Sequence, residues 1–361
     1  MLNQNLPKYL AVSEWIKQNI YNHTFKAGEK LMSENKLCEK FSISRQTARQ
    51  AIAILEKEGL ISKKQGSGTY VNHTFFNSQS FSKTIGLIIP SLEQAIYPEI
   101  ISGIEEILSD HDYHLLLRLT HHKVNTEREQ LLTLLHSNID GLIIEATKSA
   151  LPNPNLDLYH QFLKRNIPLL FINSYYPSLT SSFIVMDNEK GGRLATQHFI
   201  QQGHKNITGI FKYDDIPGNL RYKGFLTEMY ENKLSVNESA IIWYSTENEK
   251  QLFSPENFPS LLKKLNHSTA IICDNDLLAM KFMNLLATHS INVPEQLSLI
   301  SFNNSYLNEL GPLTLSSISY PKNELGKLAA ESILTMSQNT DYEIKQIYEP
   351  TLIKRQSVKP L

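Results

Sequence analysis

The sequence predicts two folded parts of different kinds, a small helical head with a β-hairpin and a large α/β body built from two doubly wound parallel sheets. Helical and hairpin patterns fill residues 6–71, whereas short apolar runs alternate with helical segments, in two successive series, from Thr84 onward. Residues 1–72 hold 11 Lys and Arg against 6 Asp and Glu, and the remainder holds 24 against 30. We therefore expect a basic head over 1–72, a linker over 73–83 and an acidic body over 84–361.

The head is expected to begin with two helices. Apolar residues from Leu10 to Ile20 are spaced for one buried helical face, and a loop follows from Ala27 to Leu31. Ser33 and Glu34 then open a second, short helix. The acidic side chain of Glu34 suits the first turn of this helix.

A third helix is predicted after Ser44, whose hydroxyl can accept from the unpaired amides of the first turn. Ala48, Ala51, Ile52 and Leu55 would share its buried face, and Arg45, Gln46, Arg49 and Gln50 the outer one. Arginine can reach guanine edges and phosphates in a major groove. By itself this pattern is more typical of a solvated surface helix, so the neighbouring segments decide its meaning.

The segment after the third helix predicts a β-hairpin. Gly59 suits the left-handed position that ends a helix, and two short strands, 60–64 and 69–71, are joined by a glycine-rich turn. Three helices followed by such a hairpin are typical of a winged helix-turn-helix, which binds DNA.

The segment from Leu6 to Val71 resembles the DNA-binding domain of the GntR family of bacterial regulators. The matching motifs are Ala27-Gly28, Leu31 with Ser33-Glu34, Ser44-Arg45 with Thr47 and Arg49, Glu58-Gly59-Leu60, and Gly66-Ser67-Gly68-Thr69. The resemblance implies contact with operator DNA, carried or supported by Glu34, Ser44, Arg45, Gln46, Thr47, Arg49, Gln65 and Gly66. Two alternatives stay open. In the first, Glu34 is simply a first-turn carboxylate that the helix dipole favours. In the second, Lys30, Lys63 and Lys64 are solvated lysines with only diffuse attraction to DNA.

In the body, apolar runs predict two series of parallel strands with helices between them. The expected strands are 84–89, 114–119, 141–144, 168–172 and 183–186, then 207–211, 240–243, 270–273 and 297–302. Expected helices include 98–109 and 126–136. Ligands of open α/β sheets bind beyond the carboxyl ends of the strands, so two such lobes would close a cleft around a small molecule.

Several function classes find no support in the sequence. No apolar run reaches the roughly 18 residues of a membrane span, and the amino terminus lacks a signal-peptide core, so we expect a cytoplasmic protein with no membrane contact. Cys38 and Cys273 lie far apart, which supports neither disulfides nor a zinc site. Because no hydrolase elbow, phosphate-cradling loop or metalloprotease helix occurs, we expect no enzyme, metal or cofactor.

From about Ser82 to Ser357 the body resembles the effector domain of the LacI family, which shares the fold of periplasmic sugar-binding proteins. The matching motifs are Asp140-Gly-Leu-Ile143, Asp187 with Gly191-Gly192, Gly203-His204, Arg221 with Gly224-Phe225, Asn275-Asp276, Val293-Pro294, Leu299-Ile-Ser-Phe302, Pro312-Leu-Thr314 and Lys354-Arg-Gln-Ser357. A GntR-type head on a LacI-type body is similar to the arabinose-responsive repressors. This resemblance implies a homodimer that binds a small sugar, L-arabinose.

Carried over position by position, the resemblance implies a ligand site at the strand ends. Its residues would be Tyr97, Glu145, Asn173, Asp187, Lys212, Arg221, Asn275 and Asn303. Arg221 would donate a fork of hydrogen bonds to neighbouring hydroxyls, and Glu145 or Asp187 would accept from others. Tyr97, Phe183 or Phe302 would cover the apolar face of the sugar ring.

Each ligand-site assignment has a structural alternative. Asp187 and Asn275 each precede a helix that they could merely cap, Asp276 is expected to serve the fold, and Lys212 could be a surface lysine. Arg221, which follows a loop containing Pro217 and Gly218, has no obvious structural partner nearby, and this favours it as a ligand residue. The family often has an aspartate pair where this chain has Asn303 and Asn304, which puts affinity or sugar selectivity in doubt.

The combined prediction is a repressor of carbohydrate utilisation genes that L-arabinose releases from its operator. The same architecture could instead answer to another sugar or small metabolite, or activate transcription. An enzyme or a transport-linked binding protein with an acquired head is the third class.

Overall fold

The structure, a computed structural model, describes residues 7–21, 24–26, 28–64, 67–72, 82–310 and 313–361. Contacts divide the chain into two compact units, Met1–Ser82 and Lys83–Leu361, which are called the head and the body below. The predicted wing residues Gln65 and Gly66, and the predicted linker up to residue 81, lie outside the described residues.

The head contains three helices and a two-stranded antiparallel hairpin around one apolar core. Its elements are α1 (Lys8–Tyr21), α2 (Glu34–Phe41), α3 (Arg45–Lys57), β1 (Ile61–Lys64) and β2 (Gly68–Val71). The predicted cap of α3 is confirmed, because Ser44 accepts from the backbone N–H of Thr47. Ser33 caps α2 in the same way, by accepting from the backbone N–H of Lys36. Gly59 has φ of 73°, the left-handed conformation that turns the chain from α3 into the hairpin.

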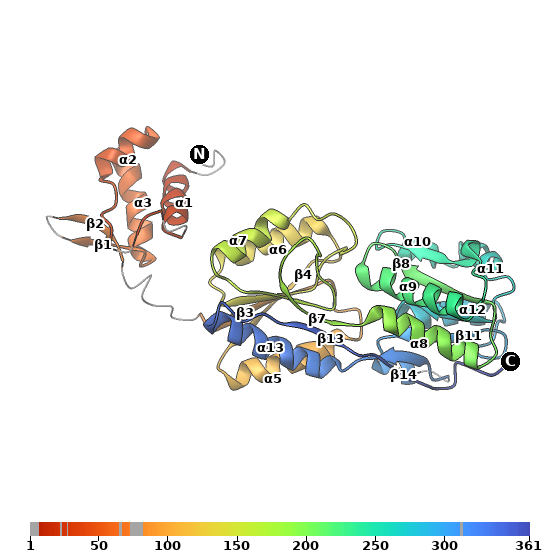
Figure 1. Ribbon diagram of the computed structural model, residues 1–361. Helices are drawn as coiled ribbons and strands as arrows, with labels where there is room; N and C mark the ends of the chain where they lie inside the picture. The colour runs from red at the N-terminus through yellow and green to blue at the C-terminus, as the bar shows by residue number, and fades with distance from the viewer. Residues whose placement is uncertain (1–6, 22–23, 27, 65–66, 73–81, 311–312) are drawn as a thin grey trace. The chain divides into compact units, whose positions relative to one another are not determined.

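The first lobe of the body has a six-stranded, all-parallel sheet in the order β13-β7-β6-β5-β3-β4. Helices α5 and α13 cover one face of this sheet, and α6 and α7 cover the other (Figure 1). The elements are β3 (Thr84–Ile89), α5 (Tyr97–Asp110), β4 (His114–Leu119), α6 (Val124–His136), β5 (Gly141–Ile144), α7 (Leu156–Lys164), β6 (Leu169–Ile172), β7 (Ser182–Met186), α13 (Lys322–Gln338) and β13 (Lys345–Tyr348).

The second lobe has a six-stranded sheet in the order β14-β12-β11-β10-β8-β9, in which only β14 is antiparallel. Helices α8 and α9 pack together on one face, and α12 lies on the other. The elements are α8 (Asn188–Gln201), β8 (Ile207–Lys212), α9 (Ile216–Glu231), η1 (Glu238–Ala240), β9 (Ile242–Tyr244), α10 (Glu249–Leu252), α11 (Phe258–Lys264), β10 (Ala270–Cys273), α12 (Asp276–Thr288), β11 (Ser298–Phe302), η2 (Tyr306–Glu309), β12 (Ser316–Ser319) and β14 (Thr351–Ile353).

The chain passes between the two lobes three times, after β7, after β12 and after β13. The predicted architecture of two doubly wound lobes is therefore confirmed. Strands β12 and β13 escaped prediction because they carry serine, lysine and glutamine rather than an unbroken apolar run, and β14 because it is only three residues long. Their pairing comes from the neighbouring strands, not from their own sequence.

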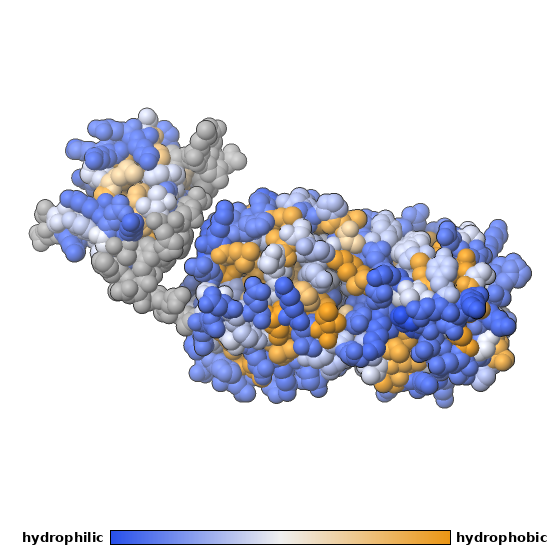
Figure 2. Space-filling view, in the orientation of Figure 1, coloured by the Kyte–Doolittle hydropathy of each residue, from blue (hydrophilic) through white to orange (hydrophobic). Residues whose placement is uncertain are grey.

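Polar residues dominate the visible face of the body, and apolar residues form separate patches on it (Figure 2). None of the helices within the described ranges combines the length and the apolar character that a membrane crossing requires.

Candidate functional site

The first candidate site is the outer face of α3 in the head. Arg45, Gln46 and Arg49 are exposed there, while Ala48, Ala51, Ile52 and Leu55 are buried, as the sequence pattern predicts. The Arg45 Nε donates to Asn35 Oδ1 at 3.0 Å, and the Arg49 Nε donates to Glu34 Oε2 at 2.9 Å. Each bond holds the base of a guanidinium group against α2. The terminal nitrogens of these exposed side chains are left for a base edge or a phosphate.

The amino end of α3 is organised by Ser44 and Thr47. The Ser44 hydroxyl accepts from the Thr47 N–H at 3.2 Å, and the two hydroxyl groups lie 2.8 Å apart. These residues thus serve the helix cap. Glu34 lies in the first turn of α2, where its charge favours the helix dipole, and it also pairs with Arg49.

Lysines on the hairpin side of the head add positive charge to that of the α3 arginines. The Nζ atoms of Lys30 and Lys64 lie 6.0 and 5.1 Å from the ring centre of Tyr70. Lys63 instead pairs with Glu56 at 2.7 Å, so part of its charge is neutralised. We therefore expect Lys30 and Lys64 to attract DNA more strongly than Lys63 does.

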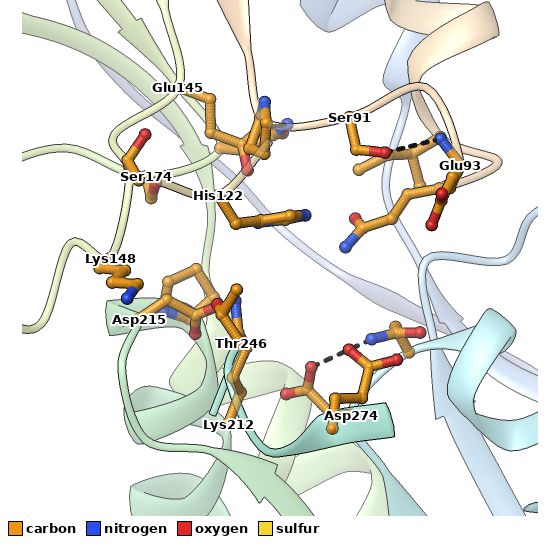
Figure 3. Close-up of a pocket in the computed structure, with 18 of the residues that line it drawn as sticks. Ser91, Glu93, His122, Glu145, Lys148, Ser174, Lys212, Asp215, Thr246 and Asp274 are labelled. Atoms are coloured by element: carbon orange, nitrogen blue, oxygen red, sulfur yellow. Dashed lines mark hydrogen bonds and ion pairs between the residues drawn. The ribbon is translucent and has the colours of Figure 1, made fainter. Parts of the chain in front are cut away.

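The second candidate site is a cavity of about 500 Å³ between the two lobes of the body. Its walls are the carboxyl ends of strands β3, β4, β5 and β6 in one lobe and of β8, β9, β10 and β11 in the other. Figure 3 shows side chains from both lobes around this cavity, such as Glu145 and His122 from the first lobe and Lys212 and Asp274 from the second. Among the predicted ligand residues, the cavity lining contains Glu145, Asn173, Lys212, Arg221, Asn275 and Asn303.

One wall of the cavity presents a carboxyl group and an amide. The Asn173 Nδ2 donates to Glu145 Oε2 at 2.7 Å, and the Tyr320 hydroxyl donates to Asn173 Oδ1 at 3.2 Å. Burial raises the pKa of Glu145 to about 7, although the Asn173 bond opposes that shift. This wall can accept hydrogen bonds from a ligand with hydroxyl groups.

The opposite wall holds Arg221 in a fixed position. Its guanidinium carbon lies 4.4 Å from the ring centre of Phe302, and its Nε donates to Asn188 Oδ1 at 2.9 Å. Its Nη1 pairs with Asp274 Oδ1 at 3.3 Å and also donates to the backbone carbonyl of that residue. The expectation that Arg221 lacks a structural partner is therefore wrong, because its partners come from other elements.

Close packing of α8 and α9 brings Arg221 to this wall. A Cβ atom at Gly192 would lie 2.1 Å from the backbone oxygen of Arg221, and one at Gly224 would lie 2.0 Å from that of Glu189. Only glycine permits such an approach of two backbones. The two glycines therefore set the position of the Arg221 backbone.

Lys212 is not a surface lysine, since only 11% of its side chain is exposed. Its Nζ lies 3.6 Å from Asp214 Oδ1 and 3.3 Å from Asp215 Oδ2. Burial opposes the charge of Lys212, but Asp215, Asp214 and Asp274 outweigh it and raise the pKa. Lys212 is thus a charged hydrogen-bond donor at the cavity wall.

Two predicted ligand residues lie outside the cavity lining. Asp187 accepts from the Lys190 N–H at 2.8 Å and caps α8, as its structural alternative proposed, and its neighbour Asn188 lines the cavity instead. Tyr97 is fully buried behind Glu145, and burial together with that carboxylate raises the pKa of its hydroxyl. These two residues support the wall rather than forming it.

The predicted aromatic platform is also corrected. Phe302 is fully buried and carries the Arg221 guanidinium on its face, and Phe183 stacks on Tyr175 with the ring centres 4.3 Å apart. Tyr244 and Tyr320 line the cavity in their place. Tyr320 follows β12, a strand that the sequence did not predict, whereas Tyr244 is the last residue of β9 and directly follows the expected strand 240–243.

Asn275 and Asn303 line the cavity while also serving the fold. Asn275 Oδ1 accepts from the Leu278 N–H at 2.9 Å, which caps α12. Asn303 has φ of 98°, and its backbone carbonyl accepts from the buried amine of Lys322 at 3.0 Å. Asp276, in contrast, accepts from Ser317 Oγ at 2.8 Å and the Ser305 N–H at 2.6 Å, so its expected structural role is confirmed.

Sequence reasoning missed His121, His122 and Asp274, although each follows a correctly predicted strand. The rule that ligands meet strand ends could have found them. Burial, followed by the positive charge of Lys212, lowers the pKa of His122 to about 4, so this imidazole is neutral near pH 7. Within the described ranges, no group of three or more histidine, cysteine or carboxylate side chains could hold a metal ion.

The arrangement suits a small polyhydroxylated ligand. Carboxylates and amide oxygens accept hydrogen bonds, whereas Arg221, Lys212 and the amide nitrogens donate them, and a hydroxyl group can do both. Because the two lobes contribute different partners, a ligand that bonds to both would favour a closed cleft.

Comparisons with known proteins agree with both parts of the structure. The family model of bacterial regulatory proteins of the gntR family matches residues 8–71, and that of a periplasmic binding protein-like domain matches residues 196–358. The chain is 36% identical to the arabinose metabolism transcriptional repressor of Halalkalibacterium halodurans, covering 97% of this chain and 96% of the relative. It is 35% identical to the protein of the same name from Geobacillus stearothermophilus, covering 100% of both.

A solved structure is also similar to the body. It is a periplasmic binding protein/LacI transcriptional regulator from Alkaliphilus metalliredigens complexed with D-xylulofuranose. The identity is 26% and the TM-score 0.67, covering 77% of this chain and 99% of that one.

Proposed function

Since this chain belongs to the family of arabinose metabolism transcriptional repressors, we propose that L-arabinose binds in the body cavity and thereby releases the head from operator DNA. The chain is a DNA-binding regulator of sugar metabolism rather than an enzyme. The named relatives support the choice of L-arabinose as the effector.

The observation that carries the proposal is the pairing of opposite chemistries across one cavity. Glu145 and Asn173 line it from one lobe, and Arg221 and Lys212 from the other. A pentose has neighbouring hydroxyl groups that could accept from Arg221 while donating to Glu145. Sugar binding would thus tie the two lobes together.

In the proposed mechanism, two bodies form a homodimer whose heads read a pseudo-palindromic operator. Arg45 and Arg49 would contact base edges or phosphates, with Gln46 beside them and Gln65 and Gly66 bringing the wing to the minor groove. Closure of the cleft would change the relation between the lobes and hence the spacing or freedom of the heads.

An electrophoretic mobility shift on DNA from upstream of the regulated genes tests this function. We expect L-arabinose to release the full chain from the DNA and D-xylose not to do so. Arg45→Ala should weaken operator affinity by about 1 to 3 kcal/mol and relax the preference at one base position. Release by neither sugar would refute L-arabinose as the effector while leaving the DNA-binding regulator intact.

A second candidate is the same regulator answering to a different small sugar. Asn303 and Asn304 replace the aspartate pair common in LacI-type bodies, and a relative of 26% identity was solved with D-xylulofuranose. Calorimetry with a panel of pentoses and ketoses would decide between the two candidates. Heat released by another sugar, with none from L-arabinose, would favour the second.

A further inference from the structure

The loop that follows β5 reaches from its own lobe to the other one. The backbone N–H of Ile216 donates to Ser149 Oγ at 2.9 Å, and the N–H of Ala150 donates to the Asp214 carbonyl at 3.3 Å. Residues 147–150 belong to the first lobe, whereas residues 214 and 216 belong to the second. The loop therefore bridges the two lobes through backbone and hydroxyl groups.

An ion pair adds to this bridge at the cavity wall. The amine of Lys148 pairs with Glu247 Oε1, which follows β9 in the second lobe. Only 17% of the Lys148 side chain is exposed, against 64% for Glu247. Residues 148–150, which bond to segments 214–216 and 247, are called the latch below, and Figure 3 shows Lys148 directed toward the second lobe.

The fully buried carboxylate of Glu127 holds the loop that carries the latch in its conformation. Glu127, on α6, accepts from the Thr147 N–H at 3.2 Å and from the Tyr176 hydroxyl at 2.9 Å. It also accepts from Asn153 Nδ2 at 2.8 Å and Asn155 Nδ2 at 3.1 Å. None of these four donors is a cation.

A buried carboxylate is costly unless its oxygens are fully hydrogen-bonded. The four donors to Glu127 come from residues 147–155 and from Tyr176, so the carboxylate is satisfied only while this loop keeps its conformation. Lys148 itself has φ of 50°, a conformation that side-chain-bearing residues adopt only when their surroundings hold them in it. Glu127 thus holds Lys148, Ser149 and Ala150 in the conformation in which they contact the opposite lobe.

We propose that residues 148–150 are the latch that holds the cleft closed, and that Glu127 is the positioning residue that preorganises it. The proposal rests on the proposed function in one respect, since a closed cleft would retain the sugar effector. The latch would set how long the effector stays bound. Through closure of the cleft, it would also set the regulator's response to the effector.

The latch predicts distinct effects for two substitutions. Lys148→Met removes the ion pair but keeps the length of the side chain, and sugar should dissociate about 2- to 5-fold faster. Glu127→Gln replaces one acceptor by a donor that faces other donors, and dissociation should accelerate by about 10-fold or more. The matched control is Lys327→Met, which breaks the surface ion pair with Glu106 between α13 and α5 of the same lobe.

Hydrogen exchange of the full chain tests the latch independently of the identity of the sugar. In Lys148→Met and Glu127→Gln, the amides of Ala150 and Ile216 should exchange several-fold faster than in the unaltered chain, while Lys327→Met leaves them unchanged. Unchanged exchange at both amides in both variants, or no protection of these amides in the unaltered chain with or without sugar, would overturn the latch.

Because Glu127→Gln could unfold the lobe, Lys148→Met alone is decisive if the glutamine variant does not fold. Stopped-flow dissociation of L-arabinose supplies the second readout. If the unaltered chain does not bind L-arabinose, the effector assignment fails while the exchange result still decides the latch.

Discussion

At the scale of single residues, the cavity is built from charged groups whose partners hold them in place. Arg221 lies over the ring of Phe302 and bonds to Asn188 and Asp274 through its Nε and Nη1. The remaining nitrogen of the guanidinium fork can reach a ligand without a further loss of side-chain freedom. Lysine cannot reproduce this planar arrangement.

Arg221→Lys should therefore weaken binding of L-arabinose by about 1.5 to 3 kcal/mol, the range for a hydrogen bond to a charged group. Isothermal titration calorimetry measures the change. The control is Arg193→Lys, whose side chain pairs with Glu228 and Glu231 and is absent from the cavity lining. Equal affinities of the Arg221 variant and the unaltered chain would exclude Arg221 from the ligand contacts.

Glu145 is the carboxyl group whose charge changes near neutral pH. Burial raises its pKa from an ordinary value of 4.5 to about 7, whereas His122 stays neutral because its pKa is lowered to about 4. The folded chain thus holds the Glu145 proton more tightly than the unfolded chain. The resulting stabilisation is complete below pH 4.5 and is lost as the pH rises to about 7.

Sugar binding should follow the opposite pH trend at Glu145. A carboxylate accepts hydrogen bonds at both oxygens, so the affinity for L-arabinose should fall by up to about tenfold per pH unit below pH 7. Calorimetry between pH 5.5 and pH 8 measures this trend. Glu145→Gln should bind weakly and lose the dependence, while a slope that persists in this variant would assign it to another group.

At the scale of elements, the contact between α8 and α9 places Arg221 and Asn188 together. Gly192 and Gly224 let the two helices approach so closely that a Cβ atom at either would collide with backbone of the partner helix. Helix α8 begins with the Asp187 cap, directly after the chain leaves β7 in the first lobe. The helix pair therefore connects the crossover between the lobes to the cavity wall.

Gly192→Ala should force α8 and α9 apart and destabilise the body by about 1 to 3 kcal/mol, the usual cost of overpacking. It should also weaken sugar binding, because Arg221 moves with the backbone of α9. Thermal unfolding and calorimetry measure the two effects. The control is Gln197→Ala, on the exposed side of α8. A stable Gly192→Ala body that binds sugar normally would show that the helices can adjust.

At the scale of the whole molecule, the basic head carries the proposed DNA-binding face and the acidic body carries the proposed effector cavity. The head carries the exposed arginines of α3, and the body carries the cavity. The coupling between two such sites is a free energy, so it must act equally in both directions.

Operator DNA should weaken L-arabinose binding by the same factor by which L-arabinose weakens operator binding. Titrating the sugar into the full chain with and without saturating operator, and the operator with and without saturating sugar, gives the two ratios. Arg45→Ala at the same DNA concentration is the control for occupancy of the head. Two ratios that differ beyond error would rule out a simple two-state coupling.

The sequence by itself determined the two-part architecture, the main strands of the body, and the cap and apolar face of α3. Periodic apolar runs located the strands whose carboxyl ends form the cavity, and the cap and apolar face of α3 were evident from Ser44, Ala48 and Ala51. These features depend on local spacing, which a sequence displays directly. Lining residues such as Glu145 and Asn173 were implied by the resemblance to LacI-type bodies, and both immediately follow such strands.

Only the tertiary structure decided which polar residues face the cavity and what holds them there. Asp187 caps α8 while Asn188 lines the cavity, a difference of one position that composition does not reveal. The partners of Arg221, and the Glu127 carboxylate behind the latch, come from residues more than 15 positions away in the chain. Such contacts arise when distant segments pack together, so their identity is a property of the folded chain.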